Sequence, residues 1–210
     1  MDVERFQRLP LMGILRGGDV STVEPLVECV VAAGLETLEI TMNTPDAAAM
    51  IARLRDAAGE SLTVGAGTVL DRDDLDRALD AGATFIVAPV LVHDVVERCA
   101  ERSVPIFPGA LTPQEIYEAD RAGATMVKVF PAKFFGPDYF AEIKGPFADV
   151  RLLACGGVSP ANMAAFFDAG AAAVAFGGSV FTPAWIAERR FDRIGDGVRA
   201  LVAAYRSIDA

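Results

Sequence analysis

Residues 122–131 read Ala-Gly-Ala-Thr-Met-Val-Lys-Val-Phe-Pro, and this stretch carries the pattern that decides the fold. An Ala-Gly pair before an apolar run is typical of a helix that ends on a glycine in the left-handed conformation and turns directly into a strand. The apolar run indicates a parallel strand that is buried on both faces. The stretch therefore predicts a helix-to-strand step of an α/β protein.

The same phrase occurs three more times, at Ala33-Gly34-Leu35, Ala81-Gly82-Ala83 and Ala169-Gly170-Ala171. The glycines of successive phrases are 48, 41 and 47 residues apart, and each interval fits two βα units. Four such quarters predict a (β/α)₈ barrel, the TIM-barrel fold, as a single domain over residues 1–210. A doubly wound open sheet is the less favoured alternative, because no Gly-x-Gly-x-x-Gly follows the first strand.

Short apolar segments that alternate with helix-forming segments mark the eight predicted strands. These are Met12–Leu15, Thr37–Met42, Thr63–Thr68, Phe85–Ala88, Pro105–Phe107, Met126–Phe130, Arg151–Ala154 and Ala173–Phe176. Active groups of such a barrel lie at the carboxyl ends of its strands, and phosphate is often held by the loops after strands 7 and 8.

Composition argues against several classes of protein. The chain has 210 residues, of which 52% are hydrophobic, and a formal net charge of −10. Every apolar run is interrupted before the roughly 18–20 residues of a membrane span. The first residues, Met-Asp-Val-Glu-Arg-Phe, do not resemble a secretory signal. Since an acidic chain is also a poor nucleic-acid binder, we expect a soluble cytoplasmic protein without membrane or nucleic-acid partners.

Cysteine and histidine are scarce. Cys29, Cys99 and Cys155 are widely spaced, which favours reduced, buried thiols over a disulfide framework or a zinc site. His93 is the one histidine and is predicted at the start of a helix. This scarcity argues against a Ser-His-Asp triad and against a metal site built on several histidines.

Lys128 places an ammonium group in the middle of a predicted buried strand. Burial disfavours the charged form of lysine, and an amine that is partly neutral near pH 7 can attack a carbonyl to form a Schiff base. The chain holds only three lysines against sixteen arginines, so an isolated strand lysine indicates chemistry. The alternative is a lysine that extends from a strand end to solvent.

Strand alternation places Glu39, Thr41 and Asn43 on one face of their strand, and the apolar residues between them on the other. Because the outer face packs against helices, the polar set points into the barrel. Glu39 and Lys128 should then converge from opposite walls, since an eight-stranded barrel is narrow. The pair would titrate as a coupled unit; its alternative role is a structural ion pair.

Two glycine pairs occupy the loops expected after strands 7 and 8, in Cys155-Gly156-Gly157-Val158-Ser159 and Phe176-Gly177-Gly178-Ser179. Residues without side chains let backbone N–H groups approach an anion closely, so these loops predict a phosphate site. Arg16, at the end of strand 1, either clamps a carboxylate or is a solvated loop residue.

Several phrases together indicate a known family: Leu38-Glu39-Ile40-Thr41, Gly65-Ala66-Gly67-Thr68-Val69, Pro108-Gly109-Ala110, Lys128-Val129-Phe130-Pro131-Ala132, Gly156-Gly157-Val158-Ser159-Pro160 and Gly177-Gly178-Ser179. With them the chain resembles the class I 2-keto-3-deoxy-6-phosphogluconate (KDPG) aldolase family along essentially its whole length. The resemblance implies Lys128 as the Schiff-base lysine and Glu39 as the general acid/base. It also implies that Thr68, Pro89 and Phe130 line a pyruvate pocket, that Gly156, Gly157, Gly177, Gly178 and Ser179 hold phosphate, and that the protein forms a homotrimer.

One position departs from the gluconate-type enzymes, which carry an arginine where this chain has Asn43. The phrases around Arg16, Asn43 and Phe135 are instead similar to the 6-phosphogalactonate branch, in which an arginine ending strand 1 takes up the substrate's carboxylate end. The implied reaction is reversible cleavage of a 2-keto-3-deoxy-6-phospho sugar acid to pyruvate and glyceraldehyde 3-phosphate, without metal or organic cofactor.

Other functions fit parts of this pattern. The protein could prefer the gluconate substrate or 4-hydroxy-2-oxoglutarate. It could instead be a metal-free phosphosugar isomerase or synthase on the same barrel. A phosphosugar-binding module is a further alternative, but it leaves the buried charges of Glu39 and Lys128 unexplained.

Overall fold

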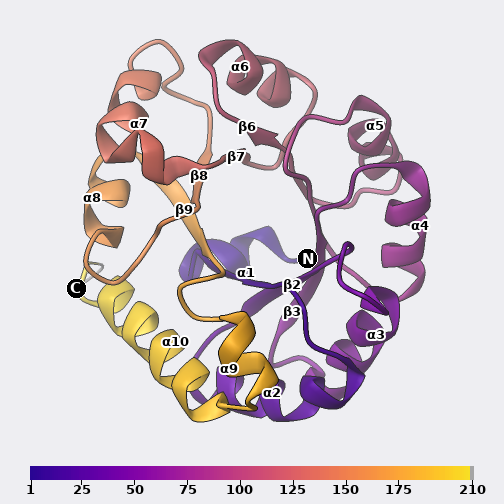
Figure 1. Ribbon diagram of the computed structural model, residues 1–210. Helices are drawn as coiled ribbons and strands as arrows, with labels where there is room; N and C mark the ends of the chain where they lie inside the picture. The colour runs from indigo at the N-terminus through magenta and orange to yellow at the C-terminus, as the bar shows by residue number, and fades with distance from the viewer. Residues whose placement is uncertain (209–210) are drawn as a thin grey trace.

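A parallel sheet forms the centre of the computed structural model, which describes residues 1–208 (Figure 1). Its order is β5-β4-β3-β2-β1-β9-β8-β7-β6. The strands are β1 Leu11–Leu15, β2 Thr37–Thr41, β3 Thr63–Gly67, β4 Ile86–Val87, β5 Ile106–Phe107, β6 Gly109–Ala110, β7 Val127–Val129, β8 Leu152–Cys155 and β9 Ala171–Phe176. The last two residues of the predicted 1–210 domain lie outside the described residues.

Helices surround this sheet and connect its strands (Figure 1). They are α1 Val3–Arg8, α2 Val20–Ala32, α3 Ala47–Ala58, α4 Arg72–Asp80, α5 His93–Glu101, α6 Pro113–Arg121, the 3₁₀ helix η1 Ala132–Phe134, α7 Gly136–Lys144, α8 Met163–Asp168, α9 Pro183–Ala187 and α10 Phe191–Arg206. None of the helices within residues 1–208 combines the length and the apolar character that crossing a membrane would require.

The fifth strand continues beyond its predicted end at Phe107 and is divided at Pro108 into β5 and β6, which is why nine strands form the eight-stranded barrel. Proline has no N–H to donate to a neighbouring strand. Its carbonyl still accepts from the Lys128 N–H at 2.9 Å, and Ile106 O accepts from the Thr125 N–H at 2.8 Å. Because β5 also pairs with β4, residues 106–110 close the barrel between β4 and β7. The predicted TIM barrel is confirmed, with its fifth strand longer than predicted.

Glycines end the helices before β2, β4, β7 and β9, as the repeated phrase predicts. Gly34, Gly82, Gly123 and Gly170 have φ values of +87°, +98°, +102° and +94°. Residues with a Cβ rarely adopt this conformation, so glycine permits the chain to leave each helix and enter the next strand within a few residues.

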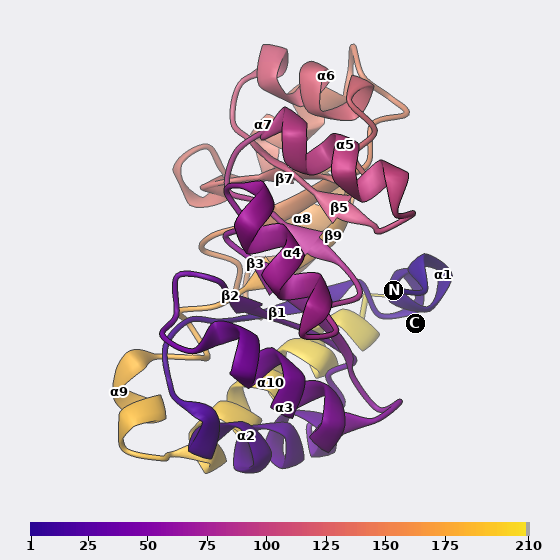
Figure 2. The same ribbon diagram turned by 90° about the vertical axis from the view of Figure 1, so that its right-hand side faces the viewer.

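Apolar side chains form one cluster outside the sheet and another inside the barrel. The outer cluster joins strand residues such as Leu38 and Ile40 to the helices, whereas the inner cluster includes Met12, Phe85 and Phe107. α1, which the sequence pattern did not predict, adds Phe6 to the inner cluster. Figure 2 shows α1 and α9 at opposite ends of the barrel. Since α9 follows the carboxyl end of β9, α1 covers the other end and leaves the face at the carboxyl ends of the strands free.

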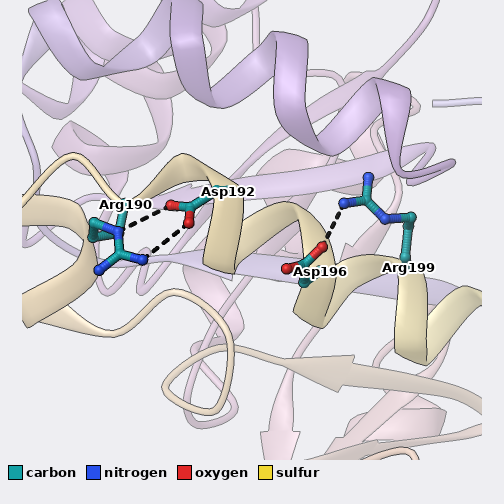
Figure 3. Close-up of polar contacts among 4 residues, drawn as sticks. All are labelled: Arg190, Asp192, Asp196 and Arg199. Carbon is teal, nitrogen blue, oxygen red and sulfur yellow. Dashed lines mark hydrogen bonds and ion pairs between the residues drawn. The ribbon is translucent and has the colours of Figure 1, made fainter.

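Two ion pairs lie on the exposed side of α10, one of them at its N-terminal end (Figure 3). Arg190 binds Asp192 at 3.0 Å, and Arg199 binds Asp196 at 2.5 Å. Exposed pairs of this kind contribute only about 0–1 kcal/mol, because water screens them. The packing of its buried residues contributes most of the stability of α10 in the fold. These residues are Ile194, Gly195, Val198, Leu201 and Val202.

Candidate active site

Lys128 lies on β7 with its side chain inside the barrel. The preceding inward residue, Met126, belongs to the inner apolar cluster, whereas Val127 and Val129 belong to the outer one. Only 6% of Lys128 is exposed, and its Nζ lies 5.3 Å from the centroid of the Phe130 ring. The π face of an aromatic ring attracts a cation and shields it from water. The structure therefore places this amine in a buried position below the strand ends.

Glu39 is the buried carboxyl group of the barrel. It is 1% exposed, and its Oε2 has no hydrogen-bond partner. Burial raises the pKa of Glu39 to about 7, although the positive charges of Lys128 and Arg16 oppose this shift. A carboxyl group with such a pKa can both accept and donate a proton near neutral pH, which suits acid–base catalysis.

Gly67 on β3 provides the space that the Glu39 carboxyl group occupies. A Cβ at Gly67 would lie 2.3 Å from Glu39 Oε1. None of the ion pairs within residues 1–208 joins Glu39 to Lys128, although their charges influence each other. The two groups thus share the barrel interior without the direct contact of a structural ion pair.

Arg16, Asn43 and Thr68 come from the loops after β1, β2 and β3 and meet at the barrel mouth. Arg16 Nη1 donates to Asn43 Oδ1 at 2.8 Å, and Nη2 donates to Thr68 Oγ1 at 3.4 Å. Thr68 has a φ of +56°, which is rare for a β-branched residue and is often found at functional sites. Three predicted substrate-binding residues are therefore in contact.

A cavity of about 700 Å³ lies beside Arg16 and Asn43, whereas Lys128, Glu39 and Thr68 do not line it. Its lining includes the predicted residues Arg16, Asn43, Phe130, Gly156, Gly157, Gly177, Gly178 and Ser179. Lys133 and Cys155 also line it, but sequence reasoning did not assign them to the site. The available signals were that Lys133 directly follows the phrase that contains Lys128 and that Cys155 directly precedes Gly156. Burial raises the pKa of the Cys155 thiol, so this group is a poor nucleophile.

The two glycine loops present free hydrogen-bond donors. The backbone N–H groups of Gly157, Gly178 and Ser179 have no acceptor among the described residues. Asn162 fixes the first loop, because its Oδ1 accepts from the Ser159 N–H at 2.8 Å and its Nδ2 donates to Gly157 O at 2.9 Å. Lys133 packs against Gly157, where an added Cβ would lie 2.5 Å from Lys133 Cβ. The Lys133 Nζ itself lies 5.1 Å from the centroid of the Phe134 ring, so the free backbone amides are the groups that suit an anion here.

Pro89 lies apart from the large cavity. It lines a separate space of about 280 Å³ together with Phe130 and the exposed His93. Phe130 therefore separates the two spaces. Within residues 1–208, no group of three or more His, Cys, Asp or Glu side chains is arranged to hold a metal ion.

Comparison with known proteins identifies the family. Residues 3–196 match the family model described as KDPG and KHG aldolase. The chain belongs to this aldolase family. Aldolases are lyases, and the family that the sequence motifs indicated is confirmed.

Relatives of this aldolase act on both sugar-acid epimers. It is 34% identical to the 2-dehydro-3-deoxy-6-phosphogalactonate aldolase of Escherichia coli (strain K12), over 95% of this chain and 96% of that protein. It is 37% identical to a 2-dehydro-3-deoxy-phosphogluconate aldolase of Pseudomonas aeruginosa, over 74% of this chain and 70% of that protein. A solved structure described as native KDPGal has a TM-score of 0.90 at 33% identity, covering 96% of this chain and 97% of that one.

Proposed function

We propose that this aldolase cleaves 2-dehydro-3-deoxy-6-phosphogalactonate to pyruvate and D-glyceraldehyde 3-phosphate through a Schiff base on Lys128. The observation that carries the proposal is the buried Lys128 amine, which shares the barrel interior with the unpaired Glu39 carboxyl group. Phe130, whose ring centroid lies 5.3 Å from the Lys128 Nζ, lines the neighbouring cavity, which offers Arg16 for a carboxylate and two glycine loops for a phosphate. These are the groups that a phosphorylated keto acid requires.

The reaction begins with attack of the Lys128 amine on the C2 ketone. Glu39, directly or through a water molecule, moves protons while the carbinolamine loses water to form an iminium ion. Glu39 then accepts the C4 hydroxyl proton, the C3–C4 bond breaks, and its electron pair enters the iminium to give an enamine. After glyceraldehyde 3-phosphate leaves, Glu39 protonates the enamine carbon and water releases pyruvate. Thr68, Pro89 and Phe130 are proposed to line the pyruvate pocket.

Preference for the galactonate epimer rests on Asn43 and Arg16. The relatives do not decide it, because identity is higher to the gluconate enzyme but coverage is greater for the galactonate enzyme. Asn43 is a short neutral amide that accepts a hydrogen bond from Arg16. A guanidinium held in this way can bind a carboxylate in a defined orientation, which favours one pose of the sugar acid.

Kinetics on both epimers tests this preference. We expect the wild type to favour the galactonate substrate, and a preference of one or two tenfold steps needs only about 1.4–3 kcal/mol of transition-state binding. Arg16→Ala should raise KM strongly. Arg199→Ala, which removes an exposed arginine from α10, is the control and should leave KM unchanged. Exclusive use of the gluconate epimer with a silent Arg16→Ala variant would refute the branch assignment but not the aldolase activity.

The phosphate site is tested by Gly178→Val. A Cβ at Gly178 meets no atom within 4 Å, so added bulk projects into open space rather than into the protein. We expect a loss of activity on phosphorylated substrates that is far larger than the loss on unphosphorylated analogues, because the valine blocks access to the loop amides. Gly178→Ala should give a smaller effect of the same kind. Equal losses on both substrate types would argue against phosphate binding here.

The protein is further proposed to act as a cytoplasmic homotrimer. Exposed aromatic side chains support an association surface next to the site: Phe134 and Phe135 are 71% and 54% exposed. Large exposed apolar groups that lie close together often mark interfaces between protein chains.

A further inference from the structure

Thr44 is a buried threonine that joins the loops following β1 and β2. It is 4% exposed, and its Oγ1 accepts from the Gly17 N–H at 3.0 Å. The same oxygen lies 3.1 Å from the Oγ1 of Thr41, which is fully buried at the end of β2. One hydroxyl group therefore links the backbone of one loop to a side chain of the neighbouring strand.

The residues next to this link are Arg16 and Asn43. Their side chains are hydrogen-bonded at 2.8 Å, but both residues are exposed. An exposed hydrogen bond holds its partners weakly, because water offers equivalent bonds to both groups. A buried bond has no such competitor, and breaking it leaves polar groups without partners. The Thr44–Thr41 bond is buried and the Gly17–Thr44 bond is partly buried, so the backbone positions of Arg16 and Asn43 depend more on these bonds than on their own exposed contact.

We infer that Thr44 is a positioning residue that holds Arg16 at the cavity mouth for the carboxylate of the substrate. This inference rests on the proposed function, in which Arg16 binds that carboxylate. Thr44 acts through the Gly17 N–H, one residue after Arg16. Thr44 also lines the cavity, so a direct contact with the substrate is the alternative that the double-mutant cycle below tests. A small displacement of a binding group is enough to impair a reaction, since a misplacement of about 1 Å can cost roughly 10²-fold in rate.

Two substitutions separate the hydroxyl group from the shape of the side chain. Thr44→Val keeps the shape and leaves the Gly17 N–H and the Thr41 hydroxyl without their partner. Thr44→Ser keeps the oxygen. Thr37→Val is the matched control, because Thr37 is a buried threonine at the start of β2, at the opposite end of that strand from Thr41 and Thr44. Thr44→Ala serves in place of valine if the Thr44→Val protein does not fold.

Steady-state kinetics on the phosphorylated substrate gives the main readout. We expect Thr44→Val to raise KM about tenfold and to change kcat little, which is the signature of lost ground-state binding. The KM and kcat of Thr44→Ser and Thr37→Val should stay within about twofold of the wild-type values. The midpoint of unfolding of each variant shows whether it is folded. An unchanged KM in Thr44→Val, or an equal rise in Thr44→Ser, overturns the inference.

A double-mutant cycle with Arg16→Ala tests whether Thr44 acts through Arg16. If it does, Thr44→Val adds little to the KM of the Arg16→Ala protein, because the group that it positions is absent. Fully additive effects overturn the inference and leave the proposed function intact. An Arg16→Ala variant with an unchanged KM has a different meaning. It would contradict the proposed role of Arg16, and the inference about Thr44 would be overturned with it.

Discussion

Replacing Lys128 with methionine is expected to lower turnover by at least roughly 10⁴-fold, the scale of losing a group that forms the covalent intermediate. Methionine has a similar length and suits a buried apolar site, so the fold should survive. The physical reason is that Lys128 is the lysine with its amine inside the barrel, shielded by Phe130. Lys133→Met is the control; it removes the lysine that lines the open cavity and should keep the covalent step.

Chemical trapping checks the same assignment directly. Incubation with pyruvate and borohydride should reduce the Schiff base and add mass to the peptide that carries Lys128. The Lys128→Met protein should take up no label, whereas the Lys133→Met protein should label like the wild type. Label on Lys133 or Lys144 in the wild type would show that Lys128 is not the nucleophile.

Glu39→Gln is expected to lower turnover by roughly 10²–10⁴-fold, the usual contribution of a positioned acid/base group. Glutamine keeps the size of the side chain but cannot carry the proton between the carbinolamine, the C4 hydroxyl group and the enamine. The measurement is the rate of aldol cleavage per folded molecule. A second measurement is exchange of the pyruvate methyl protons with deuterated water, which requires Schiff-base and enamine formation but no C–C cleavage and should fall as well.

Glu39→Gln should lower turnover but raise the stability of the protein above neutral pH. The reason is that the pKa of Glu39 rises from 4.5 in the unfolded chain to about 7 in the folded protein. The folded state then binds the Glu39 proton more tightly, so the free energy of unfolding falls as pH rises from about 4.5 through 7. Glutamine does not titrate and escapes this loss. We expect Glu39→Gln to be more stable than the wild type at pH 8, by on the order of a few kcal/mol, and to lose this advantage below about pH 4.5.

The changes in turnover and in stability distinguish a catalytic Glu39 from a Glu39 that only forms a structural ion pair. If Glu39 were a structural partner of Lys128, its removal would leave a buried ammonium unpaired and destabilise the protein strongly. Activity per folded molecule would then largely survive. A Glu39→Gln protein that is less stable at pH 8 but nearly fully active would therefore contradict the assignment of Glu39 as acid/base.

The sequence determined the barrel and the inward placement of its two buried charged groups. Both rest on local physics: Gly34, Gly82, Gly123 and Gly170 end helices through a backbone conformation that other residues avoid. Strand alternation then assigns Glu39 and Lys128 to the interior, because side chains on a strand point to opposite faces in turn. Each signal is complete within a few neighbouring residues, and the barrel follows from its repetition along the chain, so both can be read without the folded structure.

Only the tertiary structure decided how the loops meet. Arg16, Asn43 and Thr68 come from three loops, and their hydrogen bonds exist because β1 pairs with β2 and β2 pairs with β3 in parallel. The link from Thr44 to Gly17 has the same origin. Contacts between residues far apart in the chain depend on strand register and on the exact course of each loop, which no local pattern of residues specifies. The sequence thus determined which chemical groups this protein has, and the closed barrel determined which of them act together.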